Sequence, residues 1–481
     1  MSPVHRRMLH FALGVSLLTL APPAMPLLAD TGCSTTITFG ETLLCTLGTP
    51  GEVASFNFSA NGGDRIIVRM GRSTSGLNPH IQIQAPGGST VCEAYSYAAA
   101  VDTSACLLPS IGAYTILASN YNSTVTGGYG ISLQRLNAPA GVSSLSFGQT
   151  ALATIVAAGE LDAYTFTASA GDTMLARMGS TAAGLSPHIR LFGPDGIKLC
   201  EAYNANYSGV DIAGCLLPTD GAYTIVVNDY NGADTGNYGI TIQRVNNPAG
   251  GIALAFGTNS LAALGAAGDL DTYTFAAASG DTVLMRMGSS TFGLSPQIRL
   301  YGPDGVKVCE AYNNAVADTS GCIVPSSGSY TILANAHNSA QPGSYGFALQ
   351  RLNNPSGAVD LKYRWPTMGT LAVAGGLATY TFSATANSSV AIQVSSPNTS
   401  IYPFLRLYVP DGTQLCEAYG YPRGVAISSC PLPTDGAYTL TVSNYGGAAT
   451  GDFSLFLRCL TDSCGPTDLP VFNVYLPAIR S

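Results

Sequence analysis

The sequence predicts an all-β protein made of four tandem antiparallel β-sandwich domains of jelly-roll type. Three observations lead to this prediction. A cassette with two cysteines recurs four times at a nearly constant step, short segments in each copy alternate between apolar and polar residues, and turn-forming residues stand between those segments. Short alternating segments divided by turns are typical of strands in a sandwich.

The N-terminal segment predicts export from the cell. Arg6 and Arg7 precede an apolar run over 11–21, and prolines then interrupt it. Such a pattern is typical of a signal peptide, and the run is too short for a membrane span. We therefore expect cleavage after Ala29 and a secreted or cell-surface protein with no transmembrane span in the mature chain. Lipid attachment at Cys33 is a weaker alternative, because Cys45 would then lack a partner.

The four cassettes begin at Cys92, Cys200, Cys309 and Cys416, at steps of 108, 109 and 107 residues. A constant step of this size indicates an internal repeat whose unit is about one domain long. The predicted division is a signal peptide (1–29), repeat 1 (30–141), repeat 2 (142–250), repeat 3 (251–357), repeat 4 (358–465) and a C-terminal tail (466–481).

Repeat 2 illustrates the strand pattern. Segments with a period of two cover 162–166, 173–177, 188–192, 223–227 and 238–243, and turns such as Gly193-Pro-Asp-Gly196 separate them. No window of a dozen residues has a helical apolar stripe. The Gly-x-Tyr-Thr motif opens one strand in every copy, and we expect its tyrosine to lie in the core (Tyr114, Tyr223, Tyr330 and Tyr438).

The twelve cysteines predict six local disulfides. Each cysteine has a near neighbour in the sequence, and no copy has the C-x-x-C or paired histidines that a zinc site needs. In an exported chain, this pattern is typical of a disulfide framework. The expected pairs are Cys33–Cys45, Cys92–Cys106, Cys200–Cys215, Cys309–Cys322, Cys416–Cys430 and Cys459–Cys464.

Short turns of Asn, Pro, Gly and small residues join the repeats, and we call them the Asn-Pro-Gly turns. They read Asn-Ala-Pro-Ala-Gly at 137–141, Asn-Asn-Pro-Ala-Gly at 246–250 and Asn-Asn-Pro-Ser-Gly at 353–357. Five residues are too few for wide separation, so neighbouring repeats should touch. The outer repeats carry the additional cysteine pairs, and only repeat 4 lacks the Arg-Met-Gly found at Arg69, Arg177 and Arg286. These differences are typical of capping units in an array. The tail is expected to be a last strand or linker, with a sorting signal as the alternative.

The residues of repeat 2 also carry a family resemblance. Gly-x-x-Asp-x-Tyr-x-Phe (159–166), the Pro-His-Ile-Arg-Leu-Phe-Gly-Pro-Asp-Gly segment (187–196) and Leu-Pro-x-x-Gly-x-Tyr-Thr-Ile (217–225) occur in this order. This order resembles the bacterial pre-peptidase C-terminal domain, and the resemblance extends over all four repeats. It implies β-sandwich modules of secreted or surface proteins, some of which bind collagen, polysaccharide or calcium. The Cys-Glu-Ala-Tyr segment is an addition that marks a divergent, disulfide-containing version.

The sequence contains no recognisable catalytic motif. Only 10% of the residues are charged and the net charge is −8, which also argues against nucleic acid as a partner. The recurrent glutamates lack the second carboxylate that glycoside hydrolysis needs, so we expect each to make a structural hydrogen bond across the disulfide loop (Glu93, Glu201, Glu310 and Glu417). His80 and His188 become Gln297 and Phe404 in the other copies, which favours a structural role. We expect no catalytic residue and no cofactor.

No metal site is assigned, although calcium remains an alternative for repeats 2 and 3. Glu160, Asp162 and Asp172 recur as Asp269, Asp271 and Asp281. Calcium needs six to eight oxygen ligands, and an ordinary Gly-Asp turn accounts for part of this set.

Loop tyrosines are the best candidates for recognition. Tyr121, Tyr230 and Tyr445 follow the Gly-x-Tyr-Thr strand, His337 takes this place in repeat 3, and Tyr207 lies in a disulfide loop. Tyrosines on a rigid scaffold bind at low entropic cost. The tyrosine of Cys-Glu-Ala-Tyr, in contrast, is expected to pack on the disulfide. The leading hypothesis is a non-catalytic protein that binds extracellular polysaccharide or a matrix or surface protein. A structural spacer is the alternative, and a secreted hydrolase is the weakest.

Overall fold

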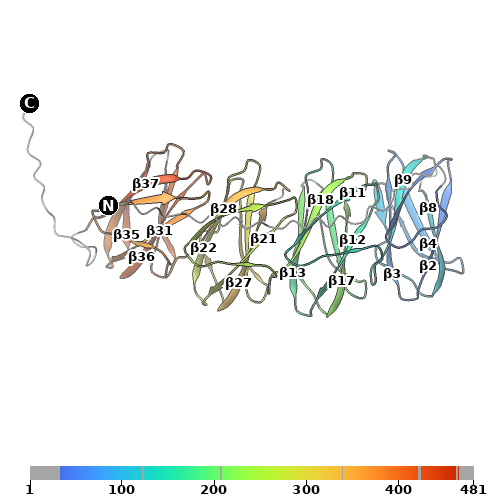
Figure 1. Ribbon diagram of the computed structural model, residues 1–481, viewed down its shortest axis with the longest axis horizontal. Helices are drawn as coiled ribbons and strands as arrows, with labels where there is room; N and C mark the ends of the chain where they lie inside the picture. The colour runs from blue at the N-terminus through green and yellow to red at the C-terminus, as the bar shows by residue number, and fades with distance from the viewer. Residues whose placement is uncertain are drawn as a thin grey trace, which may run out of the picture.

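The computed structural model describes residues 33–121, 124–205, 208–337, 340–420, 424–461 and 464. Within these ranges the chain contains strands and no helix, so none of its described segments is a helix that could cross a membrane. The strands form eight sheets, which follow one another along the longest axis of the molecule (Figure 1). The predicted signal peptide and tail lie outside the described residues.

The strands of repeats 1 and 2 form two sheets in each repeat. In repeat 1, one sheet has the order β2 (Val53–Ala60), β8 (Gly112–Asn120), β4 (Pro79–Gln84) and β5 (Thr90–Tyr95), and the other has β1 (Glu41–Leu47), β9 (Gly127–Arg135), β3 (Arg65–Arg72) and β6 (Ala100–Asp102), with β7 (Cys106–Leu107) beside β3. In repeat 2 the sheets are β10 (Ser143–Ser144), β12 (Asp162–Ala168), β17 (Gly221–Asp229), β14 (Pro187–Phe192) and β15 (Lys198–Tyr203), and β11 (Thr150–Ile155), β18 (Gly236–Arg244), β13 (Thr173–Ser180) and β16 (Gly209–Leu216).

Repeats 3 and 4 have the same order. In repeat 3 the sheets are β19 (Ile252–Ala253), β21 (Asp271–Ala277), β27 (Gly328–Ala336), β23 (Pro296–Tyr301) and β24 (Lys307–Tyr312), and β20 (Thr258–Leu264), β28 (Gly343–Arg351), β22 (Thr282–Ser289) and β25 (Val316–Asp318), with β26 (Cys322–Ile323) beside β22. In repeat 4 they are β29 (Val359–Asp360), β31 (Leu377–Ala384), β36 (Gly436–Asn444), β33 (Pro403–Tyr408) and β34 (Gln414–Tyr419), and β30 (Pro366–Leu371), β37 (Gly451–Cys459), β32 (Ser388–Ser395) and β35 (Gly424–Leu432).

This strand order is similar to a jelly roll, because most successive strands alternate between the two sheets of a sandwich, and one hairpin in each repeat stays within a sheet (β4–β5, β14–β15, β23–β24 and β33–β34). The prediction of an all-β sandwich fold is therefore confirmed. One detail departs from purely antiparallel sheets: β10, β19 and β29 each pair in parallel with the first long strand of their sheet over two residues. These short strands lie directly after the Asn-Pro-Gly turns, where the chain enters a new repeat.

The tyrosines of the Gly-x-Tyr-Thr motif lie in the core, as predicted. Tyr223 is fully buried, its ring stacks on Phe166 and its hydroxyl donates a hydrogen bond of 2.6 Å to the carbonyl of Thr219. Tyr114, Tyr330 and Tyr438 make the same bond to the residue four positions earlier. Each therefore fills the core and also anchors the turn before its own strand.

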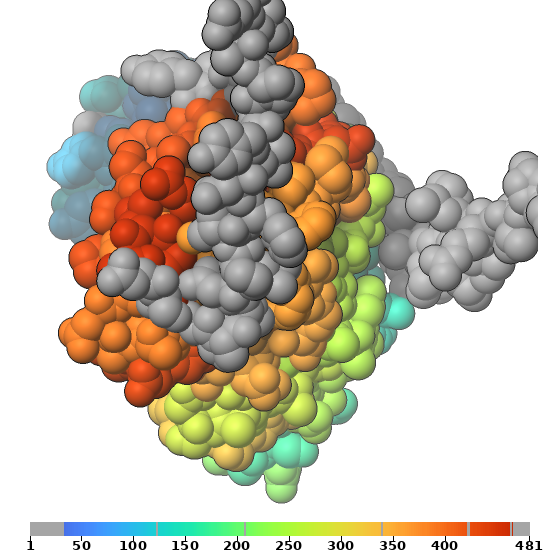
Figure 2. Space-filling view, turned by 90° about the vertical axis from the view of Figure 1, so that its left-hand side faces the viewer, coloured from blue at the N-terminus to red at the C-terminus, as the bar shows by residue number. Residues whose placement is uncertain are grey.

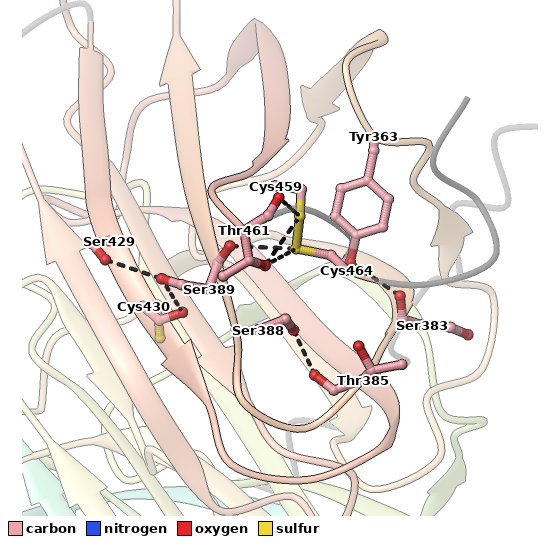
Figure 3. The surroundings of a disulfide bond; sticks show 10 residues. All are labelled: Tyr363, Ser383, Thr385, Ser388, Ser389, Ser429, Cys430, Cys459, Thr461 and Cys464. Atoms are coloured by element: carbon pink, nitrogen blue, oxygen red, sulfur yellow. Dashed lines mark hydrogen bonds between the residues drawn. A yellow bond between two sulfur atoms is a disulfide. The ribbon is translucent and has the colours of Figure 1, made fainter. Parts of the chain in front are cut away.

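All six predicted cysteine pairs are present as disulfides. In repeat 2, Cys200 of β15 and Cys215 of β16 join the edge strands of the two sheets, and the equivalent pairs do so in the other repeats. In repeat 4, Cys459–Cys464 fastens the end of β37 next to Ser389, and the Cys464 carbonyl accepts a hydrogen bond from the Thr385 amide (Figure 3). The disulfides therefore close the open edges of the sandwiches.

The sandwiches stack face to face. All eight residues of β13 are buried, whereas β32, its counterpart in repeat 4, alternates between buried and more exposed positions. In β13, Met174 and Ala176 face the core of repeat 2, while Leu175 packs with Val245, Leu270, Tyr301 and Leu333 between repeats 2 and 3. A strand at a joint is thus covered on both faces, and the outer sheet of an end repeat is covered on one. Viewed from the repeat 4 end, repeat 3 emerges behind repeat 4 (Figure 2).

Glycine pairs allow a very close approach at each joint. A Cβ atom on Gly239 would lie 1.9 Å from the carbonyl oxygen of Ala267, and one on its cross-strand partner Gly179 would lie 2.4 Å from the amide of Gly268. Gly71 with Gly130, and Gly288 with Gly346, occupy the same positions at the other joints. In repeat 4 the equivalent positions are Ser395 and Ser454.

The turns between repeats are fixed to the repeat that precedes them. Asn246 accepts a hydrogen bond from the Thr173 amide, and Gln243 donates one to the Ala249 carbonyl. Gly250 has a φ of +66°, a left-handed conformation that favours glycine. The same contacts recur at the other two turns (Asn137 and Gln134, Asn353 and Gln350). The apolar clusters that contain residues of two neighbouring repeats confirm the predicted contact between repeats.

Candidate functional site

Every repeat presents one stacked pair of aromatic rings at its surface. Tyr203 and Tyr230 are parallel within 2° with centroids 4.2 Å apart. The equivalent pairs are Tyr95 with Tyr121 at 4.0 Å, Tyr312 with His337 at 3.9 Å, and Tyr419 with Tyr445 at 4.9 Å. We call these the aromatic pairs. Their rings are partly open to solvent, with exposures of 54% for Tyr203 and 38% for Tyr230.

The ends of two strands position each pair. In repeat 2, Tyr203 is the last residue of β15, and Tyr230 directly follows β17. The Tyr230 amide donates a hydrogen bond of 2.7 Å to the carbonyl of Ser186, which fixes the loop that carries the second ring. The amides of Tyr121, His337 and Tyr445 make the equivalent bond in the other repeats. The pair thus rests on regular backbone.

A third side chain supports the pair from beneath. His188 lies edge-on to both rings, as do His80 in repeat 1 and Phe404 in repeat 4. His188 Nε2 lies 2.8 Å from Glu201, and Nδ1 lies 3.3 Å from the Asn228 amide nitrogen. Burial and the nearby Arg190 lower the pKa of His188 to about 4, so the imidazole is neutral at neutral pH. The predicted structural role of this histidine is confirmed.

The glutamates that recur in the cassettes make structural hydrogen bonds, but with partners other than the predicted ones. Glu201 does not bond across the disulfide loop: it accepts hydrogen bonds from Lys198 of its own strand and pairs with His188 of the neighbouring strand β14. Glu310 bonds Gln297 at 2.5 Å and Lys307 in the same way. The strand register explains the difference: Glu201 lies opposite Arg190 on β14, and His188, two residues from Arg190, is its diagonal neighbour on the same face.

Each joint contains a buried ion cluster of two arginines and one aspartate. Asp102 of repeat 1 accepts hydrogen bonds from Arg69, which lies directly across the sheet, and from Arg190 of repeat 2 at 2.8 Å. Asp211 joins Arg177 to Arg299 of repeat 3, and Asp318 joins Arg286 to Arg406 of repeat 4. The arginines hold the pKa of Asp102 at about 2 despite its burial. We call these clusters the joint triads.

Repeats 1 and 4 have uncharged residues at the triad positions that face away from the other repeats. In repeat 4, Gln393 and Ala426 are the cross-strand pair that replaces Arg177 and Asp211. In repeat 1, Gln82 replaces Arg190. The absence of Arg-Met-Gly from repeat 4 was visible in the sequence, and in the other repeats the arginine of this motif belongs to a joint triad.

Hydrogen bonds connect the joint triads to the aromatic pairs. Arg190 donates to the Asn228 side chain at 2.6 Å, and Asn228 continues to His188 beneath the pair. In repeat 3, Arg299, Asn335, Gln297 and Glu310 form the same chain, with glutamine in the place of histidine. In repeat 4, the Arg406 guanidinium instead lies over the Phe404 ring, 4.7 Å from its centroid.

The preceding repeat also holds the loop of each pair directly. Arg69 of repeat 1 donates to the carbonyls of Asp229 and Tyr230 of repeat 2, at 2.7 and 3.3 Å. Arg177 donates to the carbonyl of Ala336, and Arg286 to that of Asn444 at 3.0 Å. In each of these three repeats, an arginine of the preceding repeat thus binds the carbonyl of the residue just before the second ring (Asp229, Ala336 and Asn444). The aromatic pairs of repeats 2, 3 and 4 therefore depend on the joint.

The acidic set considered for calcium does not gather into one site. Asp172 accepts the Ser169 amide in its own turn, and Asp162 accepts the Tyr238 hydroxyl. Burial raises the pKa of Asp162 to about 6, and burial together with the Asp162 charge raises that of Glu160 to about 7. Over the described ranges, no three His, Cys, Asp or Glu side chains form a group that could hold a metal ion.

The predicted recognition residues have three outcomes. Tyr121, Tyr230 and Tyr445 lie in the aromatic pairs, whereas Tyr207 lies outside the described residues. The prediction that the Cys-Glu-Ala-Tyr tyrosines pack on the disulfide as core is wrong, because these rings point outward and are 50 to 62% exposed (Tyr95, Tyr203, Tyr312 and Tyr419). Alternation along the edge strand places them opposite the cysteine face.

No family model and no curated protein matches the sequence. Among solved structures, the pre-peptidase C-terminal domain of a collagenase from Bacillus anthracis is similar to 22% of this chain over 98% of its own length, with 18% identity and a TM-score of 0.19. A periplasmic inhibitor of g-type lysozyme from Aeromonas hydrophila is similar to 21% of this chain over 95% of its own length, with 14% identity and a TM-score of 0.18. Each of these similarities spans about one repeat. The first is to a domain of the kind that the sequence resembles.

Proposed function

We propose that this protein is an extracellular, non-catalytic binding protein whose aromatic pairs contact successive units of a polysaccharide. The observation that carries the proposal is the stack of two partly exposed rings in every repeat. Its residues vary, since His337 replaces tyrosine in repeat 3, yet the parallel stack is kept. A side chain needed only to fill space in the core would be buried, and these are not.

The chemistry of the pair suits a sugar. An exposed aromatic face packs against the C–H groups of a pyranose ring, and a tyrosine hydroxyl bonds its oxygens. Glu201 pairs with His188, the side chain that lies edge-on to both rings, and the whole chain carries a net charge of −8. Negative charge at and around the site disfavours an anionic polymer. The proposed ligand is therefore a neutral polysaccharide.

The joints support binding to a polymer in particular. Four pairs on one stiff array engage a repetitive ligand without first losing the freedom of flexible linkers, so weak contacts gain avidity. Six local disulfides are typical of proteins in oxidising surroundings, which supports an extracellular location.

A panel of immobilised polysaccharides and matrix proteins tests the proposal, probed with the purified chain and a Tyr121→Ala, Tyr230→Ala, Tyr445→Ala variant. We expect binding to at least one neutral polysaccharide and a loss of about a hundredfold or more in the variant, because several linked contacts weaken together. The matched control replaces the same tyrosines by phenylalanine, which keeps the stack, and should retain most of the binding. Equal binding by parent and alanine variant would remove the aromatic pairs as the site.

A structural spacer is the second candidate, and the joint triads favour it. Buried ion clusters and glycine contacts at every joint stiffen the array whether or not it binds a ligand. If the parent binds nothing in the panel, the spacer becomes the better account.

A further inference from the structure

A cavity of about 430 Å³ opens at the rim of the joint between repeats 2 and 3. Its repeat 2 wall is Ser180 at the end of β13, the following loop 181–186, Ala205 and Ser208, and its repeat 3 wall is Ala340 and Gln341. The two walls touch, because the Ala340 amide donates a hydrogen bond of 3.1 Å to the Ser208 hydroxyl. Both repeats therefore contribute to the lining of the cavity.

The cavity walls continue from two consecutive aromatic pairs. On the repeat 2 side, Ser186 accepts the Tyr230 amide through its carbonyl, and Ala205 is two residues beyond Tyr203. On the repeat 3 side, Ala340 is three residues beyond His337. A chain-like ligand that leaves the pair of repeat 2 toward repeat 3 would thus meet this cavity.

The lining has a definite chemistry. It consists of small side chains, hydroxyl groups and one amide, with no charged residue (Ser180, Thr181, Ser186, Ser208 and Gln341 are its polar members). A charged ligand would find no counter-charge here, and a large apolar side chain would find little besides alanines and Leu185. Hydroxyls and an amide can both donate and accept hydrogen bonds, as a sugar ring requires. The volume lies in the range of small-molecule sites.

The joint triad holds the repeat 3 wall in place. Arg177 donates one hydrogen bond to Asp211 and another to the carbonyl of Ala336, the residue before His337. Asp211 in turn holds Arg299 of repeat 3 at 2.9 Å. Arg177 is therefore a positioning residue, which holds the end of β27 at Ala336, four residues before Ala340.

We propose that this joint is a composite binding site, in which the cavity takes one uncharged sugar unit between the aromatic pairs of repeats 2 and 3. The inference rests on the proposed function and adds two things to it. The smallest complete site is a pair of docked repeats, and the preferred ligand is a neutral glycan with hydroxyl groups on both faces.

Isothermal titration of the full chain with soluble hexasaccharides tests the proposal, using neutral xylo-, cello-, malto- and N-acetylchito-oligosaccharides and an anionic oligogalacturonate. Ala205→Phe fills the cavity from an exposed position, and Gln341→Ala removes its amide. Ala213→Phe, at an exposed position of β16 outside the cavity, is the matched control. For a neutral hexasaccharide that binds the parent, we expect about tenfold weaker binding for Ala205→Phe, a smaller loss for Gln341→Ala, and no change for Ala213→Phe.

Hydrogen exchange provides a local readout in the same samples. The neutral ligand should protect the 180–186 segment in the parent and not in Ala205→Phe, while thermal unfolding of the two proteins stays alike. If both cavity variants bind as the parent does, the cavity is not part of the site, although the aromatic pairs remain so if the tyrosine-to-alanine variant loses binding. Binding of oligogalacturonate alone would contradict the ligand class.

Discussion

Replacing Asp211 by alanine is expected to lower the stability of the joint between repeats 2 and 3 by about 3–5 kcal/mol. Asp211 lies between Arg177 and Arg299, at 2.7 and 2.9 Å from their guanidinium nitrogens. Both arginine side chains are nearly buried, at 2% and 3% exposed. Without the carboxylate, two like charges remain desolvated and close together, which is far costlier than losing one exposed ion pair.

Differential scanning calorimetry of the full chain measures this effect. The matched control is a triple variant, Arg177→Gln, Asp211→Ala and Arg299→Gln, which uses the residues found at the equivalent positions of repeats 4 and 1 (Gln393, Ala426 and Gln82). Because it leaves no buried charge, it should lose less than half as much stability as Asp211→Ala. Equal losses in the two variants would show that packing, not charge, governs the joint.

Acid should weaken the joints without any mutation. The pKa of Asp102 is about 2 in the folded protein, below its ordinary value of about 4. A depressed carboxyl pKa stabilises the fold fully above the ordinary value, and this contribution is lost as the pH falls from about 4 to about 2. A loosening of the joints between about pH 4 and pH 2 would agree with a stabilising role of the joint triads. In the triple variant, this loosening should be absent from the joint between repeats 2 and 3.

Replacing the core tyrosine Tyr223 by alanine is expected to cost about 3–5 kcal/mol, whereas Tyr230→Ala should cost about 0.5–1.5 kcal/mol. Tyr223 is fully buried, stacks on Phe166 and bonds the Thr219 carbonyl. Tyr230 loses only its stack with Tyr203 and an edge contact with His188. The small cost at Tyr230 exceeds that of an ordinary exposed loop residue because the ring is paired.

Thermal unfolding and polysaccharide binding of the two variants separate packing from recognition. Tyr223→Phe is the control for the core position, since it keeps the ring and removes only the hydroxyl. We expect Tyr230→Ala to weaken binding with little loss of stability, and Tyr223→Phe to lose some stability with no change in binding. The reverse pattern would place recognition elsewhere.

The fold class was readable from the sequence because local signals agree with the global fold. Period-two segments, turn residues and paired cysteines each specify a strand, a turn or an edge, and the structure has them in those places. The tyrosine of Gly-x-Tyr-Thr was correctly placed in the core because it begins a strongly apolar strand. The same reasoning missed Tyr203: its strand is at a sheet edge, where one face is open to solvent and periodicity alone does not tell which face is outward.

The joint triads could not be derived from one repeat considered alone. In the sequence, Arg177 has the place of an ordinary polar residue in an alternating strand. Its burial is explained only by Asp211, which pairs with both Arg177 and Arg299 at the joint. The signal lay in differences between repeats: an arginine missing only from the last copy, and another replaced by glutamine only in the first. Interactions that span a joint become visible when the two ends of an array are compared with its middle.

The central claim is that the joints hold the four aromatic pairs in one fixed arrangement, so that they act together on a polymer. Small-angle X-ray scattering of the purified full chain tests it most directly, with the Asp211→Ala variant for comparison. We predict that one extended arrangement of the repeats accounts for the scattering of the parent, and that the variant requires bending at the joint between repeats 2 and 3. Scattering of the parent that requires a broad set of bent arrangements, indistinguishable from that of the variant, would contradict the claim.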